Sequence, residues 1–331
     1  MRPFTYTRPQ MAEAALAAWK GDGLYVAGGT NVADYMKLEV LQPRVLVDIS
    51  RLRDPALHRI EIDERGIRLG ALVRLAAVED HADIRTRYPV IHDTLALAAT
   101  RQIRNVATIG GNVLQRTRCE YFREISWPCN KRRPGAGCAA IGGVDRQHAI
   151  LGTSSACIAT YAGDFAQAMV ALDAIVHTIG SDGPRRIPFA DLHASPNDTP
   201  HIETILAPGE LIVALEVPAG PHTVRSRYVK VRDRTSYQFA LTGAAVAVHL
   251  ERGVVQDARI ALSGVATRPW RARQAERSLI GGGLTEGDAA RAADIAFADA
   301  KPGKLNGFKI PIGKQTIVHA LLEAKSMEVA A

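Results

Sequence analysis

LYVAGGTN, at residues 24–31, sets the architecture of the chain, because a short apolar strand runs straight into two glycines followed by Thr and Asn. Apolar residues recur at helical spacing from residue 32 onward, so the stretch predicts a strand, a glycine turn and a helix in succession. Paired glycines in such a turn let backbone N–H groups approach a phosphate. A turn of this kind is more often only a turn, so this stretch alone leaves both interpretations open.

A second turn of similar composition, TIGGN, follows at residues 108–112. Two such turns in one chain favour a large cofactor that carries phosphate groups. Neither turn contains G-x-G-x-x-G, and the chain has no GxxxxGK[ST]. Nicotinamide binding on a Rossmann unit and phosphate binding by a P-loop therefore find no support.

The composition is that of a globular protein. The chain has 331 residues, which predicts about two domains, and 47% of its residues are hydrophobic while 23% are charged. A net charge of +7 with only 5% aromatic residues does not indicate a nucleic-acid-binding face. No apolar run reaches the roughly 18 residues of a membrane span. We therefore expect no nucleic acid as a partner and no membrane insertion.

The compartment stays open at this point. The N-terminal residues lack the apolar segment of a secretory signal. A folded cofactor protein can nevertheless be exported together with a partner that carries a signal, so we expect either the cytoplasm or the periplasm.

The remaining periodicity predicts an α/β arrangement followed by an α+β part. Helices are expected at 10–20, 74–99 with two interruptions, and 165–175, and strands at 45–49, 67–72 and 211–217. PAGPH, at 218–222, is the best domain boundary. Beyond it, antiparallel strands are expected at 244–250 and 258–265, and helices at 270–279 and 286–300.

All four cysteines of the chain fall within 39 residues, at Cys119, Cys129, Cys138 and Cys157. The region between residues 114 and 152 has no periodicity, and a loop of that length is uncommon in a compact domain unless it has a function. The spacing C-x9-C-x8-C-x18-C differs from the paired CxxC of a zinc ribbon. Four thiolates can still bind zinc or an iron-sulfur cluster.

Charge around the cysteines favours the cluster. Residues 116–133 hold six cations and two acids, a net of four positive charges, which suits an anionic [4Fe-4S] site. The alternatives are a structural zinc ion, four unlinked thiols and, least favoured without a secretory signal, two disulfides.

The chain resembles the FAD-binding (medium) subunits of the molybdenum hydroxylase family, which includes xanthine dehydrogenase, carbon monoxide dehydrogenase and aldehyde oxidoreductase. The resemblance covers nearly the whole chain and rests on AGGTN at 27–31, TIGGN at 108–112, GDFAQAMVALDA at 163–174 and LSGVATRPWRARQAE at 262–276. It implies an α+β fold with a PCMH-type FAD-binding domain over 1–220, built of two α/β subdomains at about 1–55 and 56–220. A CO dehydrogenase flavoprotein-like C-terminal domain over 221–331 follows, with an antiparallel sheet and helices.

The cysteine loop, residues 114–157, narrows this resemblance because most family members lack it. CEYFREISWPCNKRRPGAGCAAIGG, at 119–143, is similar to the periplasmic aldehyde oxidoreductase branch, whose flavin subunit carries an extra [4Fe-4S] cluster. The hydroxybenzoyl-CoA reductase branch is the nearest alternative. The resemblance implies that the cluster ligands are Cys119, Cys129, Cys138 and Cys157.

The resemblance also implies which residues hold FAD. The pyrophosphate is expected on two segments, namely Val26, Ala27, Gly28, Gly29, Thr30, Asn31, Val32, Ala33 and Asp34, and Thr108, Ile109, Gly110, Gly111 and Asn112. Ile109 is expected near the isoalloxazine ring, Asp164 near the adenosine ribose, and Lys230 and Arg118 near the flavin. Without the resemblance, Asp164 would be only a helix N-cap and Lys230 a solvated strand residue.

The function implied by the resemblance is electron transfer, with no catalytic residue assigned on this chain. In a heterotrimer, a large subunit with a molybdenum cofactor oxidises the substrate, and a small subunit passes electrons through [2Fe-2S] clusters to FAD and on to an external acceptor. The chain has no molybdopterin signature and no [2Fe-2S] cysteine pattern, so we expect no activity on substrate alone. Alternatives are a flavin subunit of a xanthine dehydrogenase or hydroxybenzoyl-CoA reductase-like enzyme, a zinc-stapled nucleotide-binding interaction protein, and a flavin oxidoreductase that works alone.

Overall fold

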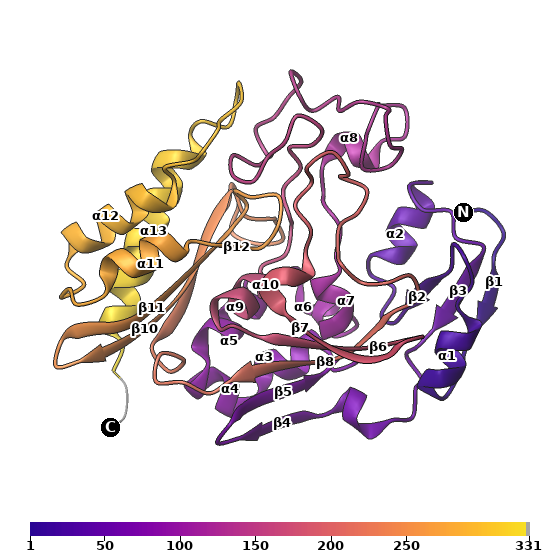
Figure 1. Ribbon diagram of the computed structural model, residues 1–331, viewed down its shortest axis with the longest axis horizontal. Coiled ribbons are helices and arrows are strands. Elements are labelled where there is room, and N and C mark those ends of the chain that lie inside the picture. Colours follow the sequence, from indigo (N-terminus) through magenta and orange to yellow (C-terminus); the bar gives the residue numbers. More distant parts are fainter. Residues whose placement is uncertain (329–331) are drawn as a thin grey trace.

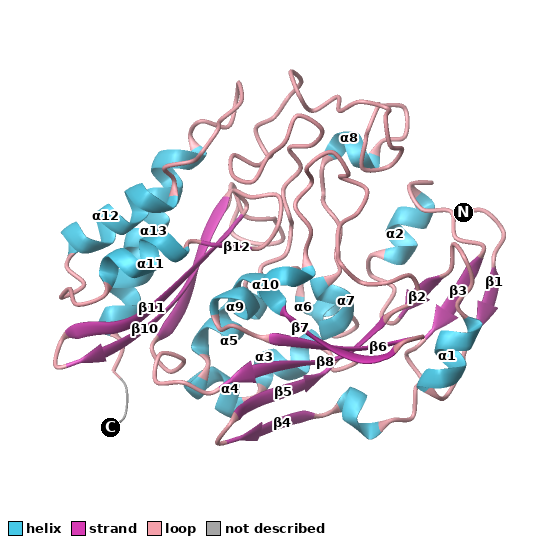
Figure 2. Ribbon diagram, in the orientation of Figure 1, coloured by secondary structure: helices cyan, strands magenta, loops and turns pink. Residues whose placement is uncertain are grey.

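Three sheets succeed one another from the N-terminal to the C-terminal side of the molecule (Figure 1). A computed structural model describes residues 1–328, so the last three residues of the predicted 221–331 domain lie outside the described residues. The secondary structure is drawn in Figure 2.

The first sheet is parallel and contains the first glycine turn. Its strand order is β1-β3-β2, with strands β1 (Thr5–Thr7), β2 (Leu24–Val26) and β3 (Val45–Asp48). Parallel strands need crossover connections, and helices α1 (Ala12–Ala18) and α2 (Val32–Lys37) provide them. The chain therefore leaves β2 through AGGTN and enters α2, as the sequence predicts.

The second sheet is antiparallel at every pairing, with the order β4-β5-β8-β6-β7. Its strands are β4 (Ile60–Asp63), β5 (Gly66–Gly70), β6 (Ile175–Gly180), β7 (Gly183–Pro188) and β8 (Leu211–Pro218). The helical region predicted at 74–99 forms three helices, because breaks occur at His81 and at Tyr88, just before Pro89. The helical segments of this part are η1 (Pro55–His58), α3 (Leu75–Asp80), α4 (Ala82–Arg87), α5 (Pro89–Ala96), α6 (Arg101–Arg104), α7 (Ile109–Val113), α9 (Phe165–Ala171) and α10 (Phe189–Leu192).

The third sheet is antiparallel with the order β12-β11-β10-β9. Its strands are β9 (Ser226–Val231), β10 (Thr242–Glu251), β11 (Val254–Ser263) and β12 (Trp270–Arg271), and its helices are α11 (Arg273–Leu279), α12 (Glu286–Ala296) and α13 (Lys309–Ser326). The helix predicted from residue 270 is wrong in its first two residues, which pair with β11 as β12. Helix α13 packs across β10 and is absent from the sequence prediction.

The predicted α+β fold class is confirmed. Within it, only the first of the two N-terminal subdomains has parallel strands, since the second sheet runs antiparallel throughout. The cysteine loop lies at the edge of the molecule shown at the top of Figure 1, where α8 (Glu120–Arg123) is the only helix between residues 114 and 157, all of which the structure describes.

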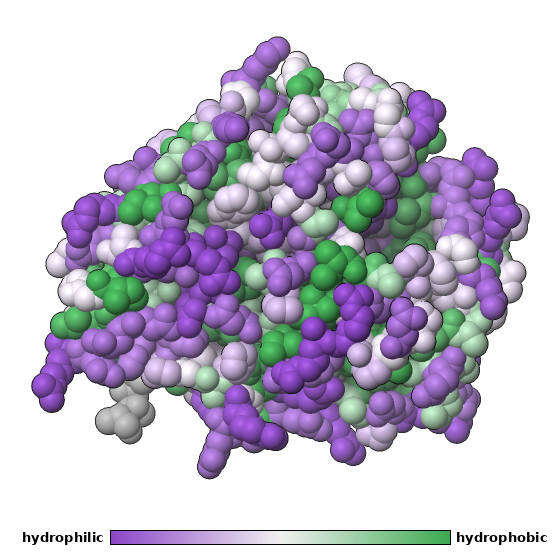
Figure 3. Space-filling model, viewed as in Figure 1, coloured by the Kyte–Doolittle hydropathy of each residue, from purple (hydrophilic) through white to green (hydrophobic). Residues whose placement is uncertain are grey.

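None of the helices within residues 1–328 combines the length and the apolar character that crossing a membrane requires. Figure 3 shows one face as a mixture of hydrophilic side chains and separate hydrophobic patches. Scattered patches of this kind are normal for a globular protein.

Candidate functional site

The two glycine turns lie against each other although they are far apart in the sequence. A Cβ atom on Gly28 would overlap the backbone carbonyl of Val106 and lie 3.2 Å from Cα of Ala107. Glycine is therefore required at position 28 because the two backbones touch there. The structure brings the predicted motifs together through this contact.

The first turn presents unpaired backbone donors. Within the described chain, the N–H groups of Gly28, Gly29, Thr30 and Asn31 have no hydrogen-bond acceptor. Gly29 has a φ of +70°, a conformation that only glycine adopts without strain. Neighbouring free N–H groups before a helix form a place where an anion can bind.

The second turn is built differently. The N–H groups of Ile109 and Gly110 donate to the carbonyls of Val73 and Ala71, at 3.0 and 2.9 Å. Thr108 accepts from the N–H of Gly111 and thereby caps helix α7. Ile109 is completely buried in the core, so its predicted place beside the isoalloxazine ring stays a prediction.

A cavity of about 660 Å³ is lined by the turn after β2, by helices of the second part of the chain, by strand β9 of the third sheet and by the cysteine loop. Of the predicted residues, its lining includes Thr30, Asn31, Asp34, Asn112, Arg118, Cys119, Asp164 and Lys230. Two lining atoms, Oδ1 of Asn112 and Nε of Arg118, are buried without a hydrogen-bond partner among residues 1–328. Buried polar atoms normally have partners, so these two atoms are available to a polar group that enters the cavity.

Asp164 and Lys230 form a buried ion pair in this cavity. Nζ of Lys230 lies 2.7 Å from Oδ2 of Asp164, and the lysine side chain is 1% exposed. The hydroxyl of Tyr228 donates to Oδ1 of the same aspartate at 2.6 Å. Asp164 stands at the N-cap of α9 but makes no side-chain capping bond. Neither residue is therefore explained as a cap or a solvated strand residue.

Asp34 connects the first glycine turn to the cysteine loop. Its carboxylate accepts from Arg123 at 2.6 Å and from Arg118 at 2.9 Å, and Arg118 also donates to Oδ1 of Asn31 at 2.6 Å. The hydrogen bond from Arg123, followed by the charges of both arginines, lowers the pKa of Asp34. Arg118 thus lines the cavity and holds the glycine turn beside Cys119.

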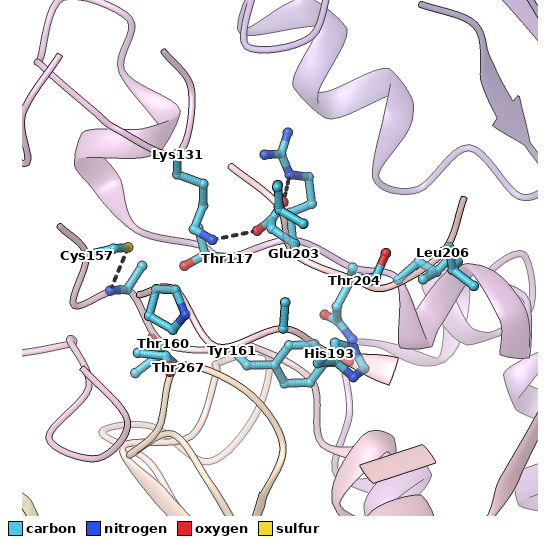
Figure 4. A pocket seen from close by; sticks show the side chains of 17 residues that line it. Thr117, Lys131, Cys157, Thr160, Tyr161, His193, Glu203, Thr204, Leu206 and Thr267 are labelled. Carbon is cyan, nitrogen blue, oxygen red and sulfur yellow. Dashed lines mark hydrogen bonds and ion pairs between the residues drawn. The ribbon is translucent and has the colours of Figure 1, made fainter. Parts of the chain in front are cut away.

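Glu203 holds the cysteine loop from another side, in a second cavity of about 240 Å³ (Figure 4). Arg116 and Lys131 both donate to its carboxylate, the lysine at 2.9 Å. Burial acts to raise the pKa of Glu203, but the two cations outweigh it and hold the pKa below its usual range. Figure 4 shows Lys131 and Glu203 pointing toward each other across from Tyr161 and His193.

The ion pairs of Asp34 and Glu203 revise the prediction that the loop carries four uncompensated positive charges. Of the six cations counted between residues 116 and 133, four pair with Asp34 or Glu203, which lie outside that stretch. Arg132 donates to loop carbonyls, including those of Tyr121 and Phe122. The positive charge therefore serves mainly to fold the loop, and only part of it is left uncompensated.

The four cysteines converge in the loop. Cys129 and Cys138 face each other across a short antiparallel bridge. Burial raises the pKa of the Cys119 thiol to about 12, and the nearby sulfurs of Cys129 and Cys157 act in the same direction. Burial likewise raises the pKa of Cys157, with smaller contributions from Cys138 and Cys129. All four are free thiols, so the disulfide alternative is not supported.

The described residues show no preassembled group of metal ligands. Among residues 1–328, no group of three or more His, Cys, Asp or Glu residues is placed to hold a metal ion. This finding by itself supports neither a structural zinc ion, which needs four ligands at about 2.0–2.3 Å around one point, nor the predicted [4Fe-4S] cluster.

Three residues at the site were not predicted from the sequence, namely His148, Glu203 and Tyr228. Nε2 of His148 lies 3.2 Å from Sγ of Cys119, and the ring lines the large cavity. Burial lowers the pKa of His148 to about 4. Tyr228 could have been suspected, because it lies two residues before Lys230 on one strand and side chains at that spacing share a face.

Comparisons with known proteins agree with this architecture. The family model "FAD binding domain in molybdopterin dehydrogenase" matches residues 2–220, and "CO dehydrogenase flavoprotein C-terminal domain" matches residues 227–309. The aldehyde oxidoreductase FAD-binding subunit PaoB of Escherichia coli is 46% identical over 330 residues, covering 98% of this chain and 99% of that protein. The carbon monoxide dehydrogenase medium chain of Hydrogenophaga pseudoflava is 25% identical, with 96% of each chain covered.

Solved structures show the same fold. A chain of the reconstituted CO dehydrogenase from Oligotropha carboxidovorans superimposes with a TM-score of 0.76 at 24% identity, covering 99% of this chain and 100% of that one.

Proposed function

The chain belongs to the family of FAD-binding medium subunits of molybdenum hydroxylases, and from this premise we propose that it is the FAD- and [4Fe-4S]-binding electron-transfer subunit of an aldehyde oxidoreductase. The similarity to an aldehyde oxidoreductase subunit over almost the full length supports the substrate class. The observation that carries the proposal is the 660 Å³ cavity, which joins the first glycine turn, the Asp164–Lys230 pair and Cys119 of the cysteine loop.

The cavity fits FAD in its chemistry. The unpaired N–H groups of residues 28–31 suit a pyrophosphate, and the unpartnered Oδ1 of Asn112 and Nε of Arg118 suit the polar edges of a ribityl chain or a flavin ring. Lys230 is held by Asp164 at the cavity wall, where its position is fixed by burial. When bound, FAD accepts electrons singly and releases them in pairs, which suits a subunit between one-electron donors and a two-electron acceptor.

Four cysteines gathered in one loop are the donor set that a four-iron cluster takes. In such a cluster each thiolate binds a different iron, so its ligands stand farther apart than those around one ion. Cys129 and Cys157 are buried, Cys119 and Cys138 are partly buried, and neighbouring thiols contribute to the raised pKa of Cys119 and of Cys157, so the four sulfurs gather in one part of the loop, which supports the proposal. Glycines at 135, 137 and 142 have positive φ angles, which lets the loop wrap around an enclosed group.

The partners follow from the role. A small subunit with [2Fe-2S] clusters supplies the electrons, a large subunit with a molybdenum cofactor oxidises the aldehyde, and a small-molecule acceptor takes up the electrons. This chain contributes the positions of the two sites, and Asp34 links them, because its carboxylate joins the FAD turn to both Arg118 and Arg123. Because the large subunit oxidises the aldehyde and the small subunit supplies the electrons, turnover needs the whole complex.

The test is co-expression of the chain with its neighbouring subunits, followed by iron, zinc and flavin analysis of the purified complex. We expect four irons in this chain beyond those of the small subunit, no stoichiometric zinc and one FAD. Cys129→Ser should lose the four irons and keep FAD, while Ser126→Ala, an exposed change in the same loop, should keep both. Unchanged iron in Cys129→Ser would contradict the ligand assignment, and zinc in place of iron would contradict the cluster.

A further inference from the structure

We propose that His148 donates a hydrogen bond from Nε2 to the sulfur of Cys119 and thereby raises the reduction potential of the four-iron cluster. The distance between Nε2 and Sγ is 3.2 Å. The inference rests on the cluster assigned under the proposed function. In it, His148 is not a ligand of the cluster but acts on it through the sulfur of Cys119.

The ring is fixed where it stands. His148 is 4% exposed, and its ring packs against that of Tyr121 with centroids 5.9 Å apart. The Tyr121 hydroxyl accepts from the N–H of Val144 at 2.7 Å, so the packing partner is itself held by the loop.

The backbone of His148 is held by the C-terminal part of the chain. Nζ of Lys309, a fully buried side chain at the start of α13, donates to the carbonyls of His148 and Gly264 at 2.9 and 2.7 Å. The carboxylate of Asp145 accepts from the N–H groups of Lys304 and Leu305, both at 2.8 Å. The contact with Cys119 is therefore tied to the third sheet and its helices as well as to the loop.

The direction of the hydrogen bond follows from the chemistry of the sulfur. A thiolate bound to iron carries no proton and can only accept, so Nε2 must carry the hydrogen. Among the sulfurs of the four cysteines, only that of Cys119 has a side-chain donor in the described part of the chain, while that of Cys157 accepts from the N–H of Ala159 at 3.5 Å.

The effect on the potential has a definite sign. Reduction adds negative charge to the cluster and its sulfurs, so a donor that points at a ligand sulfur stabilises the reduced state more than the oxidised state. His148 also lines the cavity proposed for FAD, so it lies beside both proposed sites.

The experiment compares His148→Asn with His148→Gln in the purified complex. Glutamine can bring an N–H to the position of Nε2, whereas the shorter asparagine cannot reach the sulfur. Redox titration followed by the absorbance and the electron paramagnetic resonance of the cluster should show about a tenfold lower ratio of reduced to oxidised cluster at a fixed potential for His148→Asn, which is ~59 mV for a one-electron couple. His148→Gln should stay close to the wild type.

Iron content separates the possible failures. Wild-type complex without the extra four irons would overturn the proposed function. Four irons in each variant with the same potential in all of them would overturn this inference alone. Loss of iron in both variants would show that His148 holds the loop together and does not tune the cluster, which also overturns the inference. If His148→Asn does not fold, His148→Leu takes its place with the same expected shift.

Discussion

The two glycine turns, AGGTN at 27–31 and TIGGN at 108–112, have similar compositions and lie in contact, yet their backbone donors have different partners. The N–H groups of residues 28–31 have no acceptor within residues 1–328, whereas those of Ile109 and Gly110 donate to Val73 and Ala71. The difference arises from what precedes each turn. The first follows a strand that ends at Val26, while the second lies alongside the segment that leaves β5.

The comparison assigns different tasks to the two turns. The first can offer several N–H groups to a phosphate, while the second uses two of its own to attach α7 to the second sheet. Asn112, with its unpartnered Oδ1, is the part of the second turn that faces the cavity. We therefore expect substitutions in the first turn to affect FAD binding and most of those in the second to affect stability.

The largest effect is expected for Gly28→Ala. Its Cβ would overlap the carbonyl of Val106, so the two turns would have to separate, and overpacking of this kind costs about 1–3 kcal/mol or more. We expect complete loss of FAD from the purified complex and a lower Tm. Gly29→Ala separates strain within the first turn from the contact between the turns, because its Cβ would meet only Cγ2 of Val26 at 3.8 Å and its cost is the positive φ, about 1–2 kcal/mol. A normal flavin content in Gly28→Ala would show that the contact between the turns is dispensable.

A smaller effect is expected for Thr108→Val in the second turn. The change removes the side-chain cap of α7 and should lower the free energy of unfolding by about 1 kcal/mol, as for other N-caps. Chemical denaturation measures this loss, and FAD titration should give an affinity close to that of the wild type. Thr285→Val, which removes the exposed cap of α12, is the control for capping alone. If only Thr108→Val loses FAD, the second turn binds the cofactor directly, and the comparison between the turns breaks down.

Sequence could predict the turns and most of the strands because these depend on local patterns. LYVAGGTN specifies strand, turn and helix within a few residues, and the antiparallel pair at 244–265 contains two short stretches rich in apolar residues. Helix α13 was missed because it opens with KIPIG, where proline and glycine suggest a loop, although proline is tolerated in a first helical turn.

The partners of the site residues could not be predicted, because they depend on contacts between distant segments. Glu203 lies 87 residues from Arg116, and nothing in the local pattern of either residue indicates the other. A lone His148 has no ligand spacing, and the carbonyls that occupy the second turn come from residues 71 and 73 at the end of a strand. Predicting any of these contacts requires the fold itself.

The third prediction concerns Asp34, which connects the first glycine turn to the cysteine loop. Asp34→Asn removes the charge that holds Arg118 and Arg123, so the cysteine loop should loosen and iron content should fall more than FAD content. The stability loss should stay below ~1 kcal/mol, because the carboxylate is 34% exposed and solvent screens it.

The same side chain gives an acid dependence of known sign. The pKa of Asp34 is lowered, chiefly by the hydrogen bond from Arg123, so its contribution is fully present above the unfolded pKa of ~3.9 and is lost as the pH falls through the lower folded value. The wild type should therefore release iron faster below about pH 4 than at pH 6. In Asp34→Asn, the difference between the release rates at these two pH values should be smaller. Equal acid sensitivity in both proteins would show that another carboxylate controls the loop.

The smallest effect is expected for Gly111→Ala, and this variant divides the two interpretations of the second turn most sharply. A Cβ at this position would meet only Oγ1 of Thr108 at 3.1 Å, and the residue is exposed within α7. Alanine favours a helix over glycine by ~1 kcal/mol, which offsets the close contact, so the Tm should hardly change. If the second turn only packs, FAD affinity should stay within about twofold of the wild type, because affinity changes tenfold for each 1.4 kcal/mol. If a phosphate approaches the backbone of the second turn, the new methyl group stands in its way, and flavin is lost from a protein that is otherwise as stable as before. The measurements are the FAD content, the FAD affinity and the Tm of the purified complex. Gly29→Ala in the first turn should differ from Gly111→Ala, because both its FAD affinity and its Tm should fall.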